Sequence, residues 1–244
     1  MKALAEHYAM LRERHPEDKL LIVFDIDGTI IDMRPIIAHV LQAYDAAHGT
    51  RHFAGVDAKD IDIHEDLFDD LMDALGIAAQ TAARIEPWYR EFLWSDNTIN
   101  AAHHPFPGVM DVIRWFQAQP NTYVGLNTGR PEIIRDETVK SLNTLGREHG
   151  VEFTSDLLWM NGLNPDHFIP HTKAVGIRDF RERGYRIVAV IDNEPGNIES
   201  MVTADEDDEI LFLHADTIFK TPLCDTPRTV RGNNYDVTPF LAAG

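Results

Sequence analysis

The stretch that most constrains the fold is residues 21–29, which read LIVFDIDGT. An unbroken run of aliphatic and aromatic residues is typical of a strand that is buried on both faces of a parallel sheet. Asp and Gly are poor strand formers, so the strand should end there and present Asp25 and Asp27 at its carboxyl end. Gly28 allows the backbone to turn away. In open α/β sheets this edge binds ligands, so we expect a site here.

Later segments repeat the pattern of an apolar run followed by polar residues. Strands are expected over 122–127, 157–160, 186–191 and 209–213, with helices over 109–116, 131–148 and 172–183 and after Pro195. This alternation predicts an α/β fold with a doubly wound parallel sheet that includes the first strand. A surface helix is expected over 2–14, and the acidic run 205–209 is expected to be a solvated loop. The tail after Asp216 shows weak periodicity, and we assign it no structure.

Residues 33–102 contain no strand pattern and predict an all-helical insertion. Helices are expected from Pro35 to Gly49, from 67 to 75 and from about residue 78, with Pro87 ending or kinking the last one. The aromatic residues at 88, 89, 92 and 94 are expected in the core of the insertion rather than as a substrate platform. The expected domains are therefore 1–32 with 103–244, and the insertion 33–102.

Polar residues at the other strand ends should meet the first pair of aspartates. Thr128-Gly129-Arg130 follows one strand, Asp192 ends another, and Lys173 opens a helix between them. Several carboxylates cannot share a small site unpaired, and Mg2+ takes oxygen ligands of this kind. Simpler roles stay open at this point. Thr128 could cap a helix, Lys173 could be an exposed lysine, and Arg130 could pair with an acid such as Glu132 or Asp136.

In this order, these motifs resemble the haloacid dehalogenase-like hydrolases, whose helical cap corresponds to the insertion. The resemblance covers the predicted sheet domain and implies a Rossmann-like core. It also implies a phosphatase, because the second aspartate of the first motif, Asp27, marks that branch of the family. One departure is that Asn193 and Glu194 follow Asp192 where many relatives have a second acid. Which of them assists the metal is left open.

The resemblance implies a role for each site residue. Asp25 would attack phosphorus and form an aspartyl-phosphate, and Asp27 would act as general acid and then base. Mg2+ would be held by Asp25, by Asp27 through its backbone carbonyl, and by Asp192. Thr128 and Lys173 would be catalytic by stabilising charge on the phosphoryl oxygens. The substrate-binding residues would be Thr128, Gly129, Arg130 and Lys173.

Other functions use the same residues or the same scaffold. A phosphotransferase or phosphomutase would pass the phosphoryl group to a hydroxyl instead of water, and a non-catalytic binding protein is the third possibility. A signalling receiver domain is disfavoured, because it would carry adjacent acids at the first strand end and a lysine as its last motif. The twelve histidines do not favour zinc, because no pair shows metalloprotease spacing.

Composition narrows the partners. The formal net charge of −18 argues against nucleic acid polymers and anionic membranes, both of which require a cationic face. A small phosphorylated substrate needs only local positive charge and remains the expected partner. The single cysteine, Cys224, excludes an internal disulfide and suits a reducing compartment. With no apolar signal core and no membrane-spanning stretch, the cytoplasm is the expected location.

Overall fold

The computed structural model describes residues 1–162, 168–223 and 225–242, except for the side chains of residues 96, 97 and 100. Cys224 lies outside the described residues. The chain divides into two compact units. The core unit comprises Met1–Ile30, Pro105–Thr217 and Thr221–Gly244, and the helical unit comprises Ile31–His104 and Ile218–Lys220. Both boundaries between the units differ from the expected ones by two residues, and the segment Ile218–Lys220 also belongs to the helical unit.

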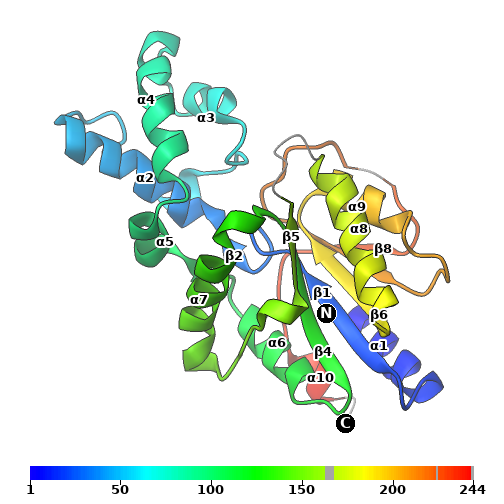
Figure 1. Cartoon of the computed structure of the whole chain (residues 1–244). Helices are drawn as coiled ribbons and strands as arrows, with labels where there is room; N and C mark the ends of the chain where they lie inside the picture. The colour runs from blue at the N-terminus through cyan, green and yellow to red at the C-terminus, as the bar shows by residue number, and fades with distance from the viewer. Residues whose placement is uncertain (163–167, 224, 243–244) are drawn as a thin grey trace. The chain divides into compact units, whose positions relative to one another are not determined.

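The core unit is built on a six-stranded sheet in the order β5-β4-β1-β6-β7-β8, in which every neighbouring pair is parallel (Figure 1). This is the α/β architecture expected from the sequence. The strands are β1 (Lys19–Phe24), β4 (Thr122–Pro131), β5 (Leu158–Asn161), β6 (Tyr185–Asp192), β7 (Leu211–Ala215) and β8 (Thr229–Gly232).

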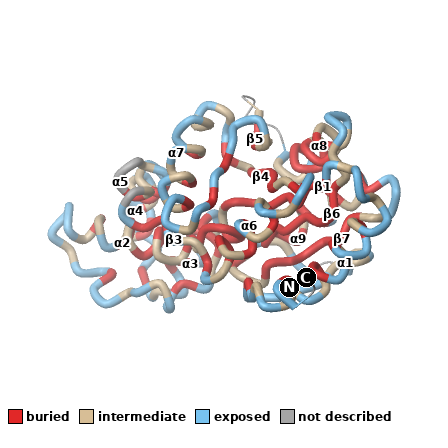
Figure 2. The backbone as a smooth tube through the Cα atoms, turned by 90° about the horizontal axis from the view of Figure 1, so that it is seen from below, coloured by how far each residue is buried: buried red, intermediate tan, exposed pale blue. Residues whose placement is uncertain are grey.

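Strand β1 lies between β4 and β6, and its apolar residues after Lys19 are all buried, as the red tube in Figure 2 shows. Leu21 and Val23 belong to a buried cluster with Ile177 and Phe180 of α8 (Ile169–Glu182) and with Ile198 of α9 (Pro195–Val202). Alternate residues of a strand point to opposite faces, so this cluster accounts for one face of β1. Helices α8 and α9 therefore cover this side of the sheet.

A separate cluster of aromatic rings joins α1 (Lys2–Arg14), α6 (Val109–Gln117) and α10 (Thr238–Leu241). Tyr8 packs edge-on against Trp115 and Phe116 at ring separations of 5.4 and 5.3 Å, and Phe240 lies 5.1 Å from Phe116. The Tyr8 hydroxyl also hydrogen-bonds Thr122 of β4 at 2.8 Å. The remaining helices of this unit are α7 (Arg135–Gly146) and the 3-10 turns η2 (Glu132–Ile134), η3 (Arg147–His149) and η4 (Ser155–Leu157).

The helical unit consists of α2 (Met33–His48), η1 (Ala58–Asp60), α3 (Phe68–Ala74), α4 (Ala79–Phe92) and α5 (Asp96–Ala102). The chain enters it through β2 (Ile31–Asp32) and leaves it through β3 (His104–Pro105), which pair with each other. Helix α4 continues through Pro87, so of the two expected outcomes, an end or a kink, the end is wrong. Tyr89 is fully buried, as a core residue should be, whereas Trp94 is exposed.

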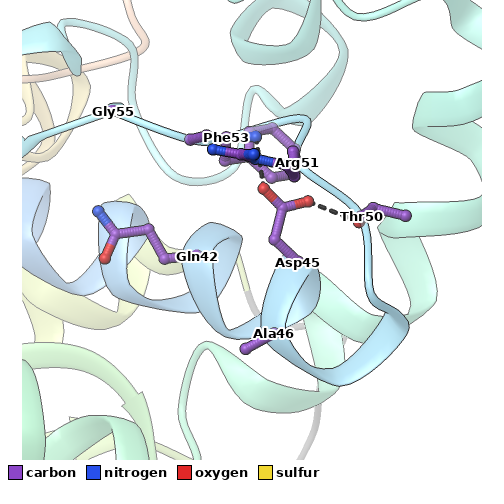
Figure 3. Close-up of a pocket in the computed structure, with 8 residues that line it drawn as sticks. Gln42, Asp45, Ala46, Thr50, Arg51, Phe53 and Gly55 are labelled. Carbon is purple, nitrogen blue, oxygen red and sulfur yellow. Dashed lines mark hydrogen bonds between the residues drawn. The ribbon is translucent and has the colours of Figure 1, made fainter.

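A hollow of about 340 Å³ lies at the end of α2, beside the loop that follows it (Figure 3). Asp45 faces this hollow and accepts hydrogen bonds from the Thr50 hydroxyl and from the backbone N–H groups of His52 and Phe53. Its carboxylate therefore serves to hold the loop 50–53 against the helix.

Two further expectations differ from the structure. The tail after Asp216 forms β8, which extends the sheet, and α10. The acidic run 205–209 is a loop with residues 206–208 exposed, as expected, but Asp205 is buried, because Arg181 and Arg228 pair with its carboxylate and the N–H groups of Glu209 and Ile210 donate to it. None of the helices in the described part of the chain combines the length and hydropathy needed to span a bilayer.

Candidate active site

The carboxyl ends of β1, β4 and β6 lie side by side at one edge of the sheet. Phe24 pairs with Leu126 on one side and with Ile191 on the other, and the Asp25 N–H donates to the Ile191 carbonyl at 2.8 Å. Asp25 and Asp192 therefore leave adjacent strands at the same level. Because parallel strands share one direction, residues 95 or more apart in sequence become neighbours here.

Lys173 lies between these two aspartates. Its Nζ atom is 2.8 Å from Asp25 Oδ1 and 2.5 Å from Asp192 Oδ2. All three residues are buried, with exposed fractions of 7% for Asp25 and 1% for each of the other two. One ammonium group thus joins two carboxylates from different strands, and Lys173 is not the exposed lysine that its sequence context alone allowed.

Burial controls the protonation of this cluster. Removal from water raises the pKa of Asp25 to about 7, and the charges of Asp192 and Asp27 act in the same direction, while Lys173 opposes them. Burial alone would lower the pKa of Lys173, but the two carboxylates raise it above the ordinary lysine value. The lysine is therefore held in its charged form.

The backbone of α8 at Lys173 is held by hydrogen bonds from β4 and β5. The Asn127 side chain of β4 donates to the Lys173 carbonyl at 2.9 Å, and the indole N–H of Trp159 donates to the neighbouring carbonyl of Thr172 at 3.0 Å. Gly176 allows the close approach of β5, since a Cβ atom there would lie 2.5 Å from the Trp159 ring. Helix α8 is thus attached to both β4 and β5 near the site.

Asp192 is held by the turn that follows β6. The backbone N–H of Glu194 donates to Asp192 Oδ1 at 2.9 Å, and the Asn197 side-chain amide donates to the same oxygen at 3.2 Å. The remaining oxygen faces Lys173. Charge-assisted bonds of this kind fix the rotamer of a carboxylate as well as stabilising it.

Asp27 occupies a different position from Asp25, because Arg130 holds both of its oxygens. Arg130 Nε is 2.8 Å from Asp27 Oδ2, and Nη2 is 2.7 Å from Oδ1. The sequence suggested Glu132 or Asp136 as the acid that pairs with Arg130, but Glu132 pairs with Arg135 instead. The observed pair joins residues 103 positions apart, one in the loop that follows β1 and the other near the end of β4.

The segment 128–130 lies within the irregularity of the pairing between β4 and β5, which falls between Asn127 and Pro131. The Thr128 hydroxyl accepts a hydrogen bond from the Arg130 N–H at 3.2 Å, so it stabilises this turn. Helix α7 begins only at Arg135, so Thr128 does not cap it. Gly129 lies against Ile169 at the start of α8, where a Cβ atom would come within 3.2 Å of that side chain.

The chain beyond β7 contributes residues that the sequence pattern did not reveal. The Thr217 hydroxyl donates to the Gly28 carbonyl at 2.6 Å, and the Tyr235 hydroxyl donates to the Thr29 carbonyl at 2.7 Å. Thr221 donates through its N–H and its hydroxyl to the carboxylate of Glu194. Three points on this segment therefore hold the loops that follow β1 and β6.

Gly28 has a positive φ of 78°, which an L-residue rarely adopts. A Cβ atom at this position would lie 2.2 Å from the side-chain amide of Asn193, so the first and last motifs are in close contact here. The Asn193 carbonyl in turn bonds His214 Nε2 of β7 at 2.8 Å.

Comparison with known proteins rests on structure rather than sequence, since no protein-family model and no curated protein matches the chain. A hydrolase of the haloacid dehalogenase superfamily, subfamily IA, from Geobacter sulfurreducens shares 10% identity at a TM-score of 0.54, with 91% of this chain and 95% of that one aligned. This chain has the haloacid dehalogenase-like fold.

Two other structures with this fold differ in how they are described. Protein Tyrosine Kinase A of Mycobacterium tuberculosis shares 18% identity at a TM-score of 0.58, covering 93% of this chain and 99% of that one. A predicted phosphoglycolate phosphatase from Haemophilus somnus shares 14% identity at a TM-score of 0.50, covering 83% and 87%. At these identities the likeness establishes the fold alone.

Within this haloacid dehalogenase-like fold, the donor set at the sheet edge suits a hard cation. Mg2+ in proteins takes one or two carboxylates and completes its coordination with water and substrate phosphate. Asp25 and Asp192 supply two buried carboxylates on one lysine. Across the described residues, no group of three or more acidic, histidine or cysteine side chains is placed to hold a metal. The Asp27 carboxylate is turned to Arg130, which leaves only its backbone carbonyl for the role expected from the resemblance.

Proposed function

We propose that this protein is a Mg2+-dependent phosphatase that hydrolyses a small phosphorylated metabolite through an aspartyl-phosphate on Asp25. The observation that carries this proposal is the buried cluster of Asp25, Lys173 and Asp192 at the carboxyl edge of the sheet. A carboxylate at that edge, next to a fixed cation, is suited to attack an electrophile that carries negative charge.

The residues divide the reaction into two steps. Asp25 attacks phosphorus, the bond from phosphorus to the ester oxygen breaks, and Asp27 gives a proton to the departing alkoxide. Asp27 then takes a proton from the water that attacks the phosphoryl group, which releases phosphate and restores Asp25. Lys173 and Thr128 stabilise the charge on the phosphoryl oxygens during both steps. When bound by Asp25, Asp192 and the Asp27 carbonyl, Mg2+ supplies the positive charge that offsets repulsion between nucleophile and phosphate.

The net charge supports a small substrate. With a formal charge of −18, the protein repels polyanions at long range, whereas a small phosphate ester needs only the local charge of Lys173. The neighbour described as a phosphoglycolate phosphatase is consistent with a substrate of this size. A metabolite panel screened for phosphate release would identify the compound.

A phosphotransferase is the second candidate, and the neighbour described as a protein tyrosine kinase favours it. Transfer to a hydroxyl group would use the same nucleophile, cation and acid. Incubation with radiolabelled ATP and a tyrosine-containing polymer separates the two candidates. Label on the polymer supports transfer, and free phosphate without labelled polymer supports hydrolysis.

The direct test is hydrolysis of an aryl phosphate with Mg2+, against a control with chelator. We expect turnover that depends on Mg2+ and a loss of at least about 1,000-fold in kcat for Asp25→Asn. Asp156→Asn, which changes an exposed aspartate in η4, is the matched control and should keep full activity. Wild-type turnover in Asp25→Asn would show that Asp25 is not the nucleophile. Turnover that the chelator leaves unchanged would contradict the metal requirement.

A further inference from the structure

Arg130 and Asp27 form a two-point ion pair that neutralises the carboxylate and also fixes its orientation. The two nitrogens of the guanidinium fork each meet a different carboxylate oxygen, at 2.8 and 2.7 Å. In such a bidentate pair the carboxylate cannot rotate without breaking at least one bond. The orientation of the Asp27 carboxylate is therefore set by Arg130.

The arginine itself is held from the side of the sheet. Only 3% of the Arg130 side chain is exposed, compared with 14% of the Asp27 side chain. Its backbone N–H donates to the Thr128 hydroxyl at 3.2 Å, and its Nη1 atom lies 3.4 Å from the hydroxyl of Thr138 in α7. The guanidinium is thus the more buried partner of the pair, and the carboxylate is the more accessible one.

This arrangement bears on whether Arg130 binds the substrate phosphate, as its place in the second motif suggested. A phosphate group engages the same guanidinium fork as a carboxylate. To bind phosphate in that way, Arg130 would have to release Asp27 and leave a largely buried carboxylate without its partner. Losing the partner of such a charge is costly.

We propose that Arg130 is a positioning residue that fixes the Asp27 carboxylate for proton transfer, and that it is not a ligand of the substrate phosphate. This inference rests on the proposed phosphatase function. It predicts that Arg130 contributes to the rate only for substrates whose leaving group must be protonated by Asp27. A poor leaving group requires protonation as it departs, whereas an activated aryl oxide leaves without it.

The test compares Arg130→Met, Asp27→Asn and the double variant on an alkyl phosphate and on dinitrophenyl phosphate. We expect Arg130→Met to lower kcat by about 10- to 100-fold on the alkyl ester, as misplacement of a catalytic group does, and by under threefold on the aryl ester, with KM within about twofold on both. The double variant should be no slower than Asp27→Asn on the alkyl ester.

A phosphate-binding arginine would give the opposite result. Arg130→Met would then raise KM on both esters to a similar extent, and its effect would multiply with that of Asp27→Asn. Either outcome overturns the positioning role. Arg135→Met is the matched control, because Arg135 makes a two-point pair with Glu132 shortly after Arg130. It should not change the ratio of rates on the two esters.

A second measurement does not depend on activity. In urea, we expect each single variant to raise the unfolding equilibrium constant, because each breaks the two-point ion pair in the folded protein. The double variant should raise the constant at least tenfold less than the product of the two single effects. Independent effects would overturn the pairing. If the wild-type protein hydrolyses neither ester, the proposed function fails by itself, and the unfolding cycle still decides whether Asp27 depends on Arg130.

Discussion

Replacing Lys173 with methionine tests how the two central aspartates are held. Methionine has a similar length and fits an apolar environment, but it removes the ammonium group that lies within 3 Å of both carboxylates. Asp192 keeps its bonds from Glu194 and Asn197, whereas Asp25 loses its ammonium partner. The variant therefore leaves a buried negative charge with little compensation.

The expected loss of stability is large. Breaking a buried ion pair by removing one partner costs about 3–5 kcal/mol. Proton uptake by Asp25 provides some relief, since its pKa is about 7 with the lysine present and rises further without it. The full cost is thus expected only above that raised pKa, and a measurement at pH 8 gives a lower bound of it. With a urea m-value of about 3 kcal/mol per M for a chain of this size, the unfolding midpoint should fall by about 1–2 M.

The assay is urea unfolding followed by tryptophan fluorescence at pH 8, with a chelator present so that no divalent cation replaces the lost charge. Lys140→Met is the matched control, because Lys140 is exposed on α7. Its change should stay within about 0.5 kcal/mol. A loss below about 1 kcal/mol for Lys173→Met, with an unchanged m-value, would refute the view that the lysine compensates two buried charges.

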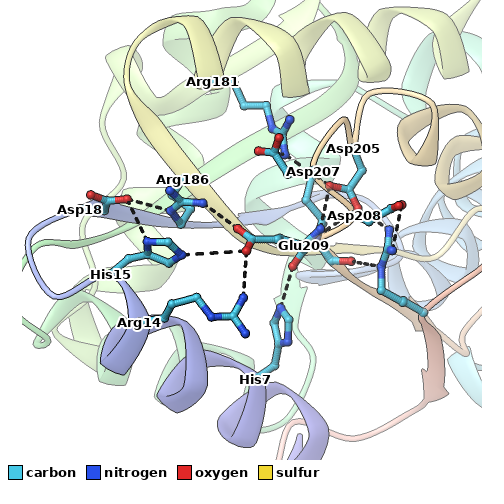
Figure 4. A network of polar contacts seen from close by, with 12 residues as sticks. His7, Arg14, His15, Asp18, Arg181, Arg186, Asp205, Asp207, Asp208 and Glu209 are labelled. Atoms are coloured by element: carbon cyan, nitrogen blue, oxygen red, sulfur yellow. Dashed lines mark hydrogen bonds and ion pairs between the residues drawn. The ribbon is translucent and has the colours of Figure 1, made fainter.

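Two further predictions concern pH. The pKa of Asp25 is raised from 3.8 to about 7 on folding, so the folded state binds this proton more tightly than the unfolded state. The stability of the wild type should therefore fall relative to that of Asp25→Asn as the pH rises from about 4 to 7. Parallel pH profiles of the two unfolding free energies would contradict this. At the opposite edge of the sheet, Arg186 and Arg14 lower the pKa of Glu209 although burial opposes them (Figure 4). Its stabilisation is present above the ordinary glutamate pKa and is lost as the pH falls through the lowered value, so Glu209→Gln should cost stability at pH 7 and much less near pH 3 in urea unfolding.

The sequence was sufficient to predict those parts of the candidate site that come directly at the end of an apolar strand. The apolar run 21–24 followed by Asp25 predicted a strand buried on both faces and placed Asp25 at its carboxyl end, as the structure shows. The strand ends at Thr128 and Asp192 could be placed at the same edge because parallel strands share a direction. Lys173 could be positioned at the start of a helix, but its burial between two acids depends on packing that no local pattern encodes.

Two features could not be predicted for physical reasons. The pairing of Arg130 with Asp27 rather than Glu132 depends on how the loop after β1 lies beside the end of β4, which is fixed only once the two strands have paired. The contribution of the tail consists of single side chains, Thr217 and Tyr235, that donate to backbone carbonyls. Such contacts require no periodicity, so the segment resembles an unstructured tail in sequence.

The central place of β1 in the sheet has a consequence for synthesis of the chain. Lys19 pairs with Tyr185 and Leu20 pairs with Thr122, so β1 leaves the ribosome well before either of its neighbours. At about 5–20 residues per second, it waits at least several seconds for each of them. During that interval an apolar strand has two open edges, which favours aggregation or capture by a chaperone. Slowing translation after residue 30 should therefore reduce the yield of folded protein more than slowing it after residue 192.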